Sequence, residues 1–347
     1  MSDLSCRYLG LELRNPLVVG SSGLTSSLEN LKTIDKMGAG AVVLKSVFEE
    51  QITFDSDYMR ISQNPSIKTW QDAFADIVSK DEYYYAEAYE YLTSYVQDHT
   101  LNQYLKLVSE AKQNISIPVI ASINCNTTQK WQYFAKKIQD AGADALELNI
   151  YLLPSDPAAT GDENEEICLN IIREVRKYVT IPVSVKTGFY FSGLASTLKK
   201  LSESGINGLT LFNRPYNPDI DIEHLRVTTS NIFSTANEYA HTLRWVALLS
   251  GKLKCDIAAS TGIHNHETVI KQLLAGADAV HMASVFYRSQ PDHFSVLPEI
   301  VSGLKHWMDR HKFKDINDFK GLLSSRKINN PASYERVQFI RLFSGIE

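Results

Sequence analysis

The sequence predicts an α/β fold in which eight parallel strands, each followed by a helix, close into a (β/α)8 barrel. Short β-branched apolar runs alternate with longer segments of helical periodicity, which is typical of parallel βαβ units. Eight such repeats favour a closed barrel, known as a TIM barrel, over an open sheet. We expect residues 1–347 to form one barrel domain, with insertions at its C-terminal face at about residues 49–98 and 214–237.

The expected strands are short apolar runs bounded by turn residues. They are Leu17–Val19, Ala41–Leu44, Val119–Ile123, Ala145–Ile150, Val183–Val185, Gly208–Phe212, Asp256–Ala259 and Ala279–Met282.

The expected helices follow these strands in order and place apolar residues at helical spacing. They are Leu28–Met37, Leu101–Gln113, Gln129–Asp140, Glu165–Tyr178, Leu194–Ser204, Glu238–Leu249, Glu267–Leu274 and Phe294–Arg310.

A weak internal repeat supports this order. The even strands are entered through glycine turns, in MGAGAVVL, AGADALEL, SGINGLTL and AGADAVHM, as expected for left-handed helix C-caps. Strands one, three and five are entered through proline, which is tolerated at the first residue of a strand. The repeat covers most of the chain.

Three stretches are longer than the minimal repeat. Glu49–Glu82 is expected to be a loop, and Tyr83–Asp98 a tyrosine-rich helix used for packing or for a subunit interface. Arg214–Asn237 follows strand six. Its acidic residues Asp219, Asp221 and Glu223 alternate like the solvent face of a strand, and a metal site there is the minor alternative.

Composition excludes several classes of protein. The net charge is −5, from 35 basic and 40 acidic residues with no basic run, so we expect neither nucleic acid nor a membrane surface as partner. No run of about 18 apolar residues is present, and no signal peptide is expected. The four cysteines are scattered without a C-x-x-C pair, which favours a cytoplasmic protein without a zinc or iron–sulfur site.

Small, amide and cationic residues follow the apolar runs, where a barrel gathers its functional groups. Lys45 and Lys186 directly follow buried strands, and a bound anion would compensate their charge. Thr261-Gly262 and Ala283-Ser284 each precede a helix, and together they predict a phosphate site. The alternative readings are surface lysines at strand ends and residues that only cap or turn.

In the residues at these strand ends, the chain resembles the dihydroorotate dehydrogenase family of FMN-dependent barrels. The resemblance is strongest over Arg14–Ser46, resumes at about Ile117–Asn213 and returns at Ala258–Tyr287. It covers most of the barrel but not Glu49–Asp98.

The resemblance implies which residues hold FMN and the substrate. The implied FMN ligands are Ser22, Gly23, Lys45, Ser46, Asn149, Lys186, Asn213, Ser260, Thr261, Gly262, Ala283 and Ser284. The implied substrate residues are Lys45, Asn149 and Asn213, and Lys45 is also the implied catalytic lysine. Arg214 departs from the family, which has Ser or Thr after this asparagine, and is expected to contact the substrate as well. A lysine beside the flavin pyrimidine would favour the anionic reduced ring.

The chain departs from the family at the catalytic base. Where the family has N-x-S-C-P-N, or serine in place of cysteine, this chain has Asn149-Ile150-Tyr151-Leu152-Leu153-Pro154, and leucine cannot accept a proton. The substrate loop N-S-x-G-x-x-N is also missing. Tyr151 and Cys125 lie nearest the strand ends and are the first candidates for a replacement base, although packing is the more ordinary role for both.

The leading hypothesis is therefore an FMN-dependent oxidoreductase of pyrimidine metabolism. A dihydropyrimidine-like substrate passes hydride to flavin N5, a soluble acceptor reoxidises the flavin, and the protein forms a homodimer as its relatives do. Two alternatives stay open at this point: a flavin-free lyase or isomerase of a phosphorylated metabolite that uses Lys186, and a flavin-binding protein without dehydrogenase activity.

Overall fold

Eight parallel strands form a closed ring at the centre of the computed structural model, which describes residues 2–48, 101–125, 131–215 and 217–335. The ring closes where strand β4 (Ala41–Val43) pairs with strand β6 (Val119–Cys125), through Val42 with Val119 and Val43 with Ile120. The predicted (β/α)8 barrel is confirmed. Its strands are β3 (Leu17–Val19), β4 (Ala41–Val43), β6 (Val119–Cys125), β7 (Ala145–Ile150), β8 (Val183–Thr187), β9 (Gly208–Leu211), β12 (Asp256–Ser260) and β13 (Ala279–Met282), with the short β5 (Val47–Phe48) beside β6.

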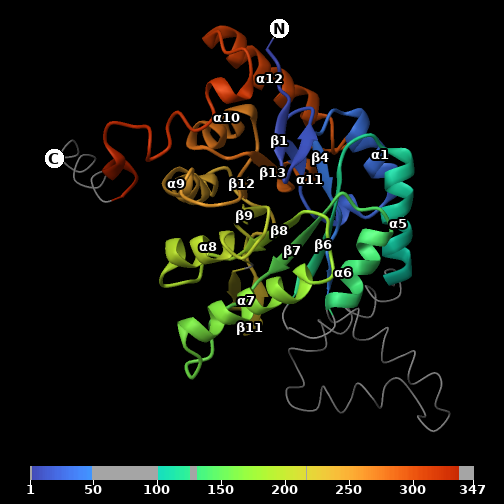
Figure 1. The fold of residues 1–347 in the computed structure, drawn as a ribbon, viewed down its shortest axis with the longest axis vertical. Coiled ribbons are helices and arrows are strands. Elements are labelled where there is room, and N and C mark those ends of the chain that lie inside the picture. Colours follow the sequence, from blue (N-terminus) through green and yellow to red (C-terminus); the bar gives the residue numbers. More distant parts are fainter. Residues whose placement is uncertain (1, 49–100, 126–130, 216, 336–347) are drawn as a thin grey trace.

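Helices surround this ring (Figure 1) and bury their apolar faces against the outward side chains of the strands. All eight predicted helices are present, with ends shifted by a few residues. They are α1 (Leu28–Lys36), α5 (Leu101–Asn114), α6 (Trp131–Asp140), α7 (Gly161–Arg176), α8 (Leu194–Ser202), α9 (Tyr239–Leu249), α10 (His266–Ala275) and α12 (Val296–His311). The sequence did not predict α11 (Ser284–Arg288) or the 3-10 turns η1 (Gly23–Thr25), η2 (Ile316–Asp318) and η3 (Pro331–Tyr334).

The predicted turns before the strands are confirmed. The glycines that precede the even strands all have positive φ, a region in which a Cβ atom is strained; they are Gly38, Gly142, Gly205 and Gly276. Pro16, Pro118 and Pro182 each stand immediately before a strand. The repeat therefore marks the junctions between helices and strands.

A hairpin that the sequence did not predict covers the N-terminal end of the barrel. It consists of β1 (Cys6–Tyr8) and β2 (Leu11–Leu13), and Tyr8 and Leu9 at its turn are fully buried. The Leu9 N–H donates a 2.8 Å hydrogen bond to Asp256 at the start of β12, and a Cβ on Gly208 would lie 2.5 Å from the Leu9 side chain. The hairpin thus seals one end of the ring.

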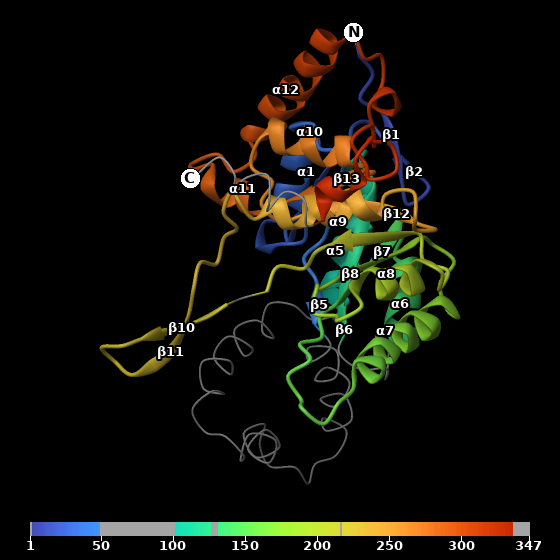
Figure 2. The ribbon, with the colours of Figure 1, turned by 90° about the vertical axis from the view of Figure 1, so that its left-hand side faces the viewer.

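The insertion after β9 contains a second hairpin, formed by β10 (Pro218–Asp221) and β11 (Arg226–Thr229). It projects away from the barrel and its helices (Figure 2). Asp219 and Asp221 lie on a strand, as their alternation predicts. The predicted loop Glu49–Glu82 and helix Tyr83–Asp98 lie outside the described residues.

Candidate functional site

A cavity of about 410 Å³ opens at the carboxyl ends of the barrel strands. Lys186 of β8 and the loops after β3, β9, β12 and β13 contribute to its wall, so segments far apart in the sequence meet there. Nine of the predicted cofactor residues line it: Ser22, Gly23, Lys186, Asn213, Ser260, Thr261, Gly262, Ala283 and Ser284.

The other three predicted cofactor residues are not among those that line this cavity. Asn149 accepts a 2.6 Å hydrogen bond from Asn213 and is aligned with Lys186 on the neighbouring strand. The Ser46 hydroxyl lies 3.1 Å from that of Ser21, which lines the cavity. The Lys45 N–H donates to the Thr25 carbonyl at 3.4 Å, and its side chain is half-buried.

The loop after β3 presents an unsatisfied polar atom in this wall. The Ser22 hydroxyl oxygen is buried and has no hydrogen-bond partner among the described residues. A buried hydroxyl without a partner is costly, which is expected where a ligand completes the bond. Ser22 is therefore placed to bind a polar ligand.

The loop after β12 is shaped for close approach of its backbone. Thr261 has φ of 79°, a left-handed conformation that is rare for a β-branched residue. Gly262 follows with φ of 75°, and a Cβ there would lie 2.2 Å from the Tyr239 nitrogen. Such strained backbone is typical of ligand clamps, and only glycine fits at the second position.

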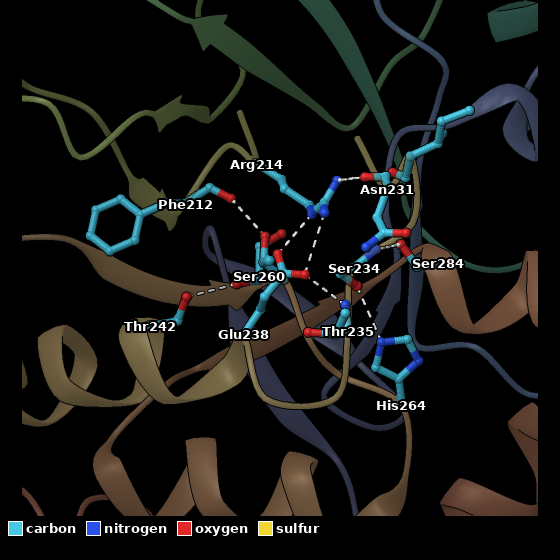
Figure 3. A network of polar contacts seen from close by, with 12 residues as sticks. Phe212, Arg214, Asn231, Ser234, Thr235, Glu238, Thr242, Ser260, His264 and Ser284 are labelled. Carbon is cyan, nitrogen blue, oxygen red and sulfur yellow. Dashed lines mark hydrogen bonds and ion pairs between the residues drawn. The ribbon is translucent and has the colours of Figure 1, made fainter. Parts of the chain in front are cut away.

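An ion pair fixes the segment that covers one side of the cavity (Figure 3). Arg214 donates to Glu238 at 2.7 Å and to the carbonyls of Asn231 and Ile232 at 2.9 and 3.0 Å. Burial acts against ionisation of Glu238, but hydrogen bonds from Arg214 and from the Thr235 N–H lower its pKa overall. Most donors of Arg214 are engaged within the protein, and its substrate contact stays a prediction.

Ser234 ties the same segment to the last two barrel loops (Figure 3). Its N–H donates to the Ser284 hydroxyl at 3.0 Å, and its own hydroxyl lies 3.2 Å from Nε2 of His264. His264 is half-buried, and burial together with Arg288 lowers its pKa. His266 instead packs against α12, since a Cβ on Gly303 would lie 2.4 Å from its ring.

The sequence interpretation did not single out several residues of this wall. The Tyr287 hydroxyl accepts a hydrogen bond from the Leu24 N–H at 3.2 Å, and its ring stacks on Phe233 at 5.1 Å. His281 lies within β13 and also lines the cavity. A histidine inside an apolar strand is a signal that could have identified it.

A second cavity of about 390 Å³ adjoins the first and shares Asn213, Arg214 and Thr261 with it. Its wall is partly aromatic, and the His241 ring lies 4.5 Å from that of Phe189. Asn213 and Arg214, two of the predicted substrate residues, thus stand where the two cavities meet.

The two candidate bases lie near each other in register. Cys125 is aligned with Ile150 across β6 and β7, directly before Tyr151; its side chain lies outside the described residues. Burial and the neighbouring Tyr190 raise the pKa of Tyr151, so its phenol is protonated at neutral pH. Leu152, at the position of the missing base, packs against the main core.

Two kinds of feature are absent from the described part of the chain. Its His, Cys, Asp and Glu residues form no group of three that could hold a metal ion. None of its helices is long and apolar enough to span a bilayer. Cys6, Cys168 and Cys255 are free thiols.

Comparison with known proteins decides the family. The sequence model of the family described as dihydroorotate dehydrogenase matches residues 92–308. The chain belongs to the dihydroorotate dehydrogenase family. The resemblance drawn from the strand ends is confirmed, as is the expectation of a dehydrogenase that acts on a CH–CH donor, with the substrate left open.

The sequence identity to individual relatives is low, but the alignments cover most of each chain. The chain is 24% identical to the catalytic subunit of dihydroorotate dehydrogenase B (NAD(+)) of Thermoplasma acidophilum, over 93% of this chain and 99% of the relative. It is 26% identical to the protein of the same name from Methanocaldococcus jannaschii, over 87% and 94%. A protein of Aeropyrum pernix, provisionally named dihydroorotate dehydrogenase A (fumarate), is 29% identical over 62% of this chain and 71% of its own length.

Proposed function

We propose that this family member binds FMN in the first cavity and oxidises a dihydropyrimidine or a related cyclic amide. The observation that carries the proposal is that one cavity joins Ser22 and Gly23, Lys186 and Asn213, and both terminal loops. FMN, when bound, supplies an acceptor for hydride.

The residues present fit such a nucleotide. Thr261-Gly262 and Ala283-Ser284 would hold its phosphate, because their loops combine small side chains with close backbone approach. Ser22, with its unpaired hydroxyl, and Gly23 would contact the ring system. Lys186 supplies a positive charge that stabilises negative charge developing nearby, which is a preorganised electrostatic contribution to hydride acceptance.

The same proposal includes the residues that would bind the substrate. Asn149 and Asn213 form an amide pair that can orient a cyclic amide by hydrogen bonding. The proposal also assigns Lys45 and Arg214 to the substrate. The Arg214–Glu238 pair holds the segment at residues 231–238 over the cavity and excludes water from it. A soluble acceptor reoxidises the flavin; the relatives' names indicate NAD(+) and fumarate as the first to test.

The exposed hairpin supports the proposal of a homodimer. Ile220, Ile222, Leu225 and Val227 are 62–88% exposed, an unusual concentration of apolar surface on a projecting ribbon. We propose that it packs against a second copy. The free thiols favour the cytoplasm as the compartment of this enzyme.

The test begins with the purified protein. It is expected to be yellow or to become so with added FMN, and anaerobic mixing with dihydroorotate or another dihydropyrimidine is expected to bleach the flavin. NAD(+) and fumarate are then tested for restoring the colour. A protein that does not retain FMN would refute the proposal, whereas bound FMN that no dihydropyrimidine bleaches would indicate a flavin-binding protein without this activity.

A further inference from the structure

The interior of the barrel contains a polar layer beneath the cavity. Glu147 on β7 is 1% exposed and is aligned with Ser122 on β6 and with Ser184 on β8. Ala145, two residues earlier on the same strand, belongs to the inner core, so Glu147 also points into the barrel. Barrel interiors are usually filled by Val, Ile and Leu, and a carboxyl group there requires an explanation.

Few hydrogen bonds satisfy this layer. Thr210 donates to Oε2 of Glu147 at 2.9 Å, and Nδ1 of His281 lies 3.9 Å from the same oxygen. Among the described residues nothing pairs with Oε1 of Glu147, Nε2 of His281, the Ser184 hydroxyl or the Tyr8 hydroxyl. An incompletely paired carboxylate in a dry interior is sensitive to neighbouring charge.

The charge that acts on Glu147 comes from Lys186. Burial raises the pKa of Glu147, whereas Lys186, on the neighbouring strand and in the cavity wall, lowers it. Two further titratable groups of the described residues lie in this layer, His281 and Tyr8, and both are neutral at pH 7. Burial and Lys186 lower the pKa of His281 to about 3, and burial and Glu147 raise the pKa of Tyr8 well above its ordinary value.

We propose that Glu147 is a positioning residue that binds a proton when the charge of Lys186 is offset by negative charge in the cavity. The inference rests on the proposed FMN function. A bound flavin that accepted a hydride, which carries two electrons and one proton, would gain one negative charge beside Lys186. The Glu147 carboxylate would then form an O–H bond with a proton from water, whose O–H bond breaks and whose hydroxide leaves to the solvent. The charge of the site would be unchanged, and nothing further would be oxidised or reduced.

The coupling between Glu147 and Lys186 can be measured without flavin. Infrared spectra of the isolated protein are recorded as a function of pH, and the Glu147 carboxyl band is identified by its loss in Glu147→Gln. We expect Lys186→Met to move the titration of this band about one unit to higher pH. The matched control is Lys106→Met, which removes a surface lysine 73% exposed, and we expect no shift there. An identical titration in Lys186→Met and wild type would overturn the coupling.

The consequence for the flavin is measured on the FMN-loaded protein. The midpoint potential is followed against pH, and the slope counts the protons taken up with two electrons. Within the pH interval over which Glu147 titrates, we expect the slope of midpoint potential against pH to be twice as steep in wild type as in Glu147→Gln. A reduced-minus-oxidised infrared spectrum is expected to show a new protonated carboxyl that Glu147→Gln lacks.

Ser184→Ala is the control for this second measurement, because it perturbs the same layer without changing its charge. It is expected to keep the wild-type slope. Equal slopes in wild type and Glu147→Gln would refute the link to the flavin. Failure to bind FMN would instead refute the proposed function, and the flavin-free titration would still decide whether Glu147 and Lys186 are coupled.

Discussion

Arg214 connects two segments that are 24 residues apart, and its ion pair with Glu238 shapes the mouth of the barrel. Other polar residues around it form short links of the same kind, such as Asn213 with Asn149 and Ser234 with Ser284. Each link joins segments that are more than 20 residues apart in the sequence. At the scale of single residues, the site is a network of such links around a few unpaired groups.

The first prediction concerns the replacement base. We expect Cys125→Ala to lower the rate of flavin reduction about 100-fold, the usual contribution of a general base, and Tyr151→Phe to lower it less than about 10-fold. The raised pKa of Tyr151 keeps its phenol protonated, whereas a thiol ionises more readily. Stopped-flow absorbance measures both.

Cys168→Ala is the control for that experiment, since Cys168 is buried in α7 and burial raises its pKa to about 12. It is expected to leave the rate unchanged. The assignment fails if Cys125→Ala reduces flavin as fast as this control.

The second prediction concerns acid stability. The pKa of His281 is about 3 in the folded protein and 6.5 ordinarily, so between these values the unfolded chain binds a proton that the folded chain does not. Stability therefore falls as pH falls below 6.5, by about 1.4 kcal/mol per pH unit from this residue. We expect His281→Gln to lose this contribution, as measured by urea unfolding at several pH values. Parallel pH profiles for both proteins would contradict it.

Residues at strand ends could be predicted from the sequence because parallel strands deliver them all to one rim. Ser22, Lys186 and Ser284 were found in this way. Glu147 and His281 were missed. A polar residue within an apolar strand is a signal, but a strand buried on both faces has no polar alternation that tells whether that residue points into the barrel or outward.

At the scale of elements, the loop between β12 and α10 is the most constrained part of the site. Its two consecutive left-handed residues, Thr261 and Gly262, bring the backbone against the start of α9. The barrel strands and helices were predictable because buried apolar runs and helical periodicity alternate regularly along the chain. The β1–β2 hairpin and the pairing of β10 with β11 were missed, since these short strands mix apolar with charged residues and lie outside that repeat.

The third prediction tests this loop. Gly262→Ala is expected to destabilise the protein by about 1–2 kcal/mol from left-handed strain, with about 1–3 kcal/mol more from the clash with α9. Gly10→Ala is the control, because Gly10 has φ of 77° but open space around its Cα. Thermal unfolding and FMN binding are measured for both. Equal losses of stability would show that the close approach at Gly262 has no energetic weight.

At the scale of the whole molecule, the helix-covered barrel contrasts with the projecting β10–β11 hairpin. Helices cover its circumference, and the β10–β11 ribbon projects away from them (Figure 2). Several apolar side chains of this ribbon are exposed. Ile220 and Val227 are direct partners across the ribbon and share one face of it. This arrangement leads to the fourth prediction, on assembly.

We expect wild type to sediment as a dimer at micromolar concentration and Ile220→Lys/Val227→Lys to sediment as a monomer with unchanged circular dichroism. Both side chains are more than 60% exposed, so the fold does not depend on them. Thr228→Lys, also on the ribbon, is the control expected to stay dimeric. A monomeric wild type would refute the dimer.

The β1–β2 hairpin at the N-terminal end of the barrel affects how protons reach Glu147. Tyr8 and Leu9 close the far end of the barrel, so we expect water to reach Glu147 from the rim where the nucleotide would lie. A bound ligand would block this route, and we expect the Glu147 carboxyl to exchange protons with solvent more slowly in the occupied protein than in the empty one.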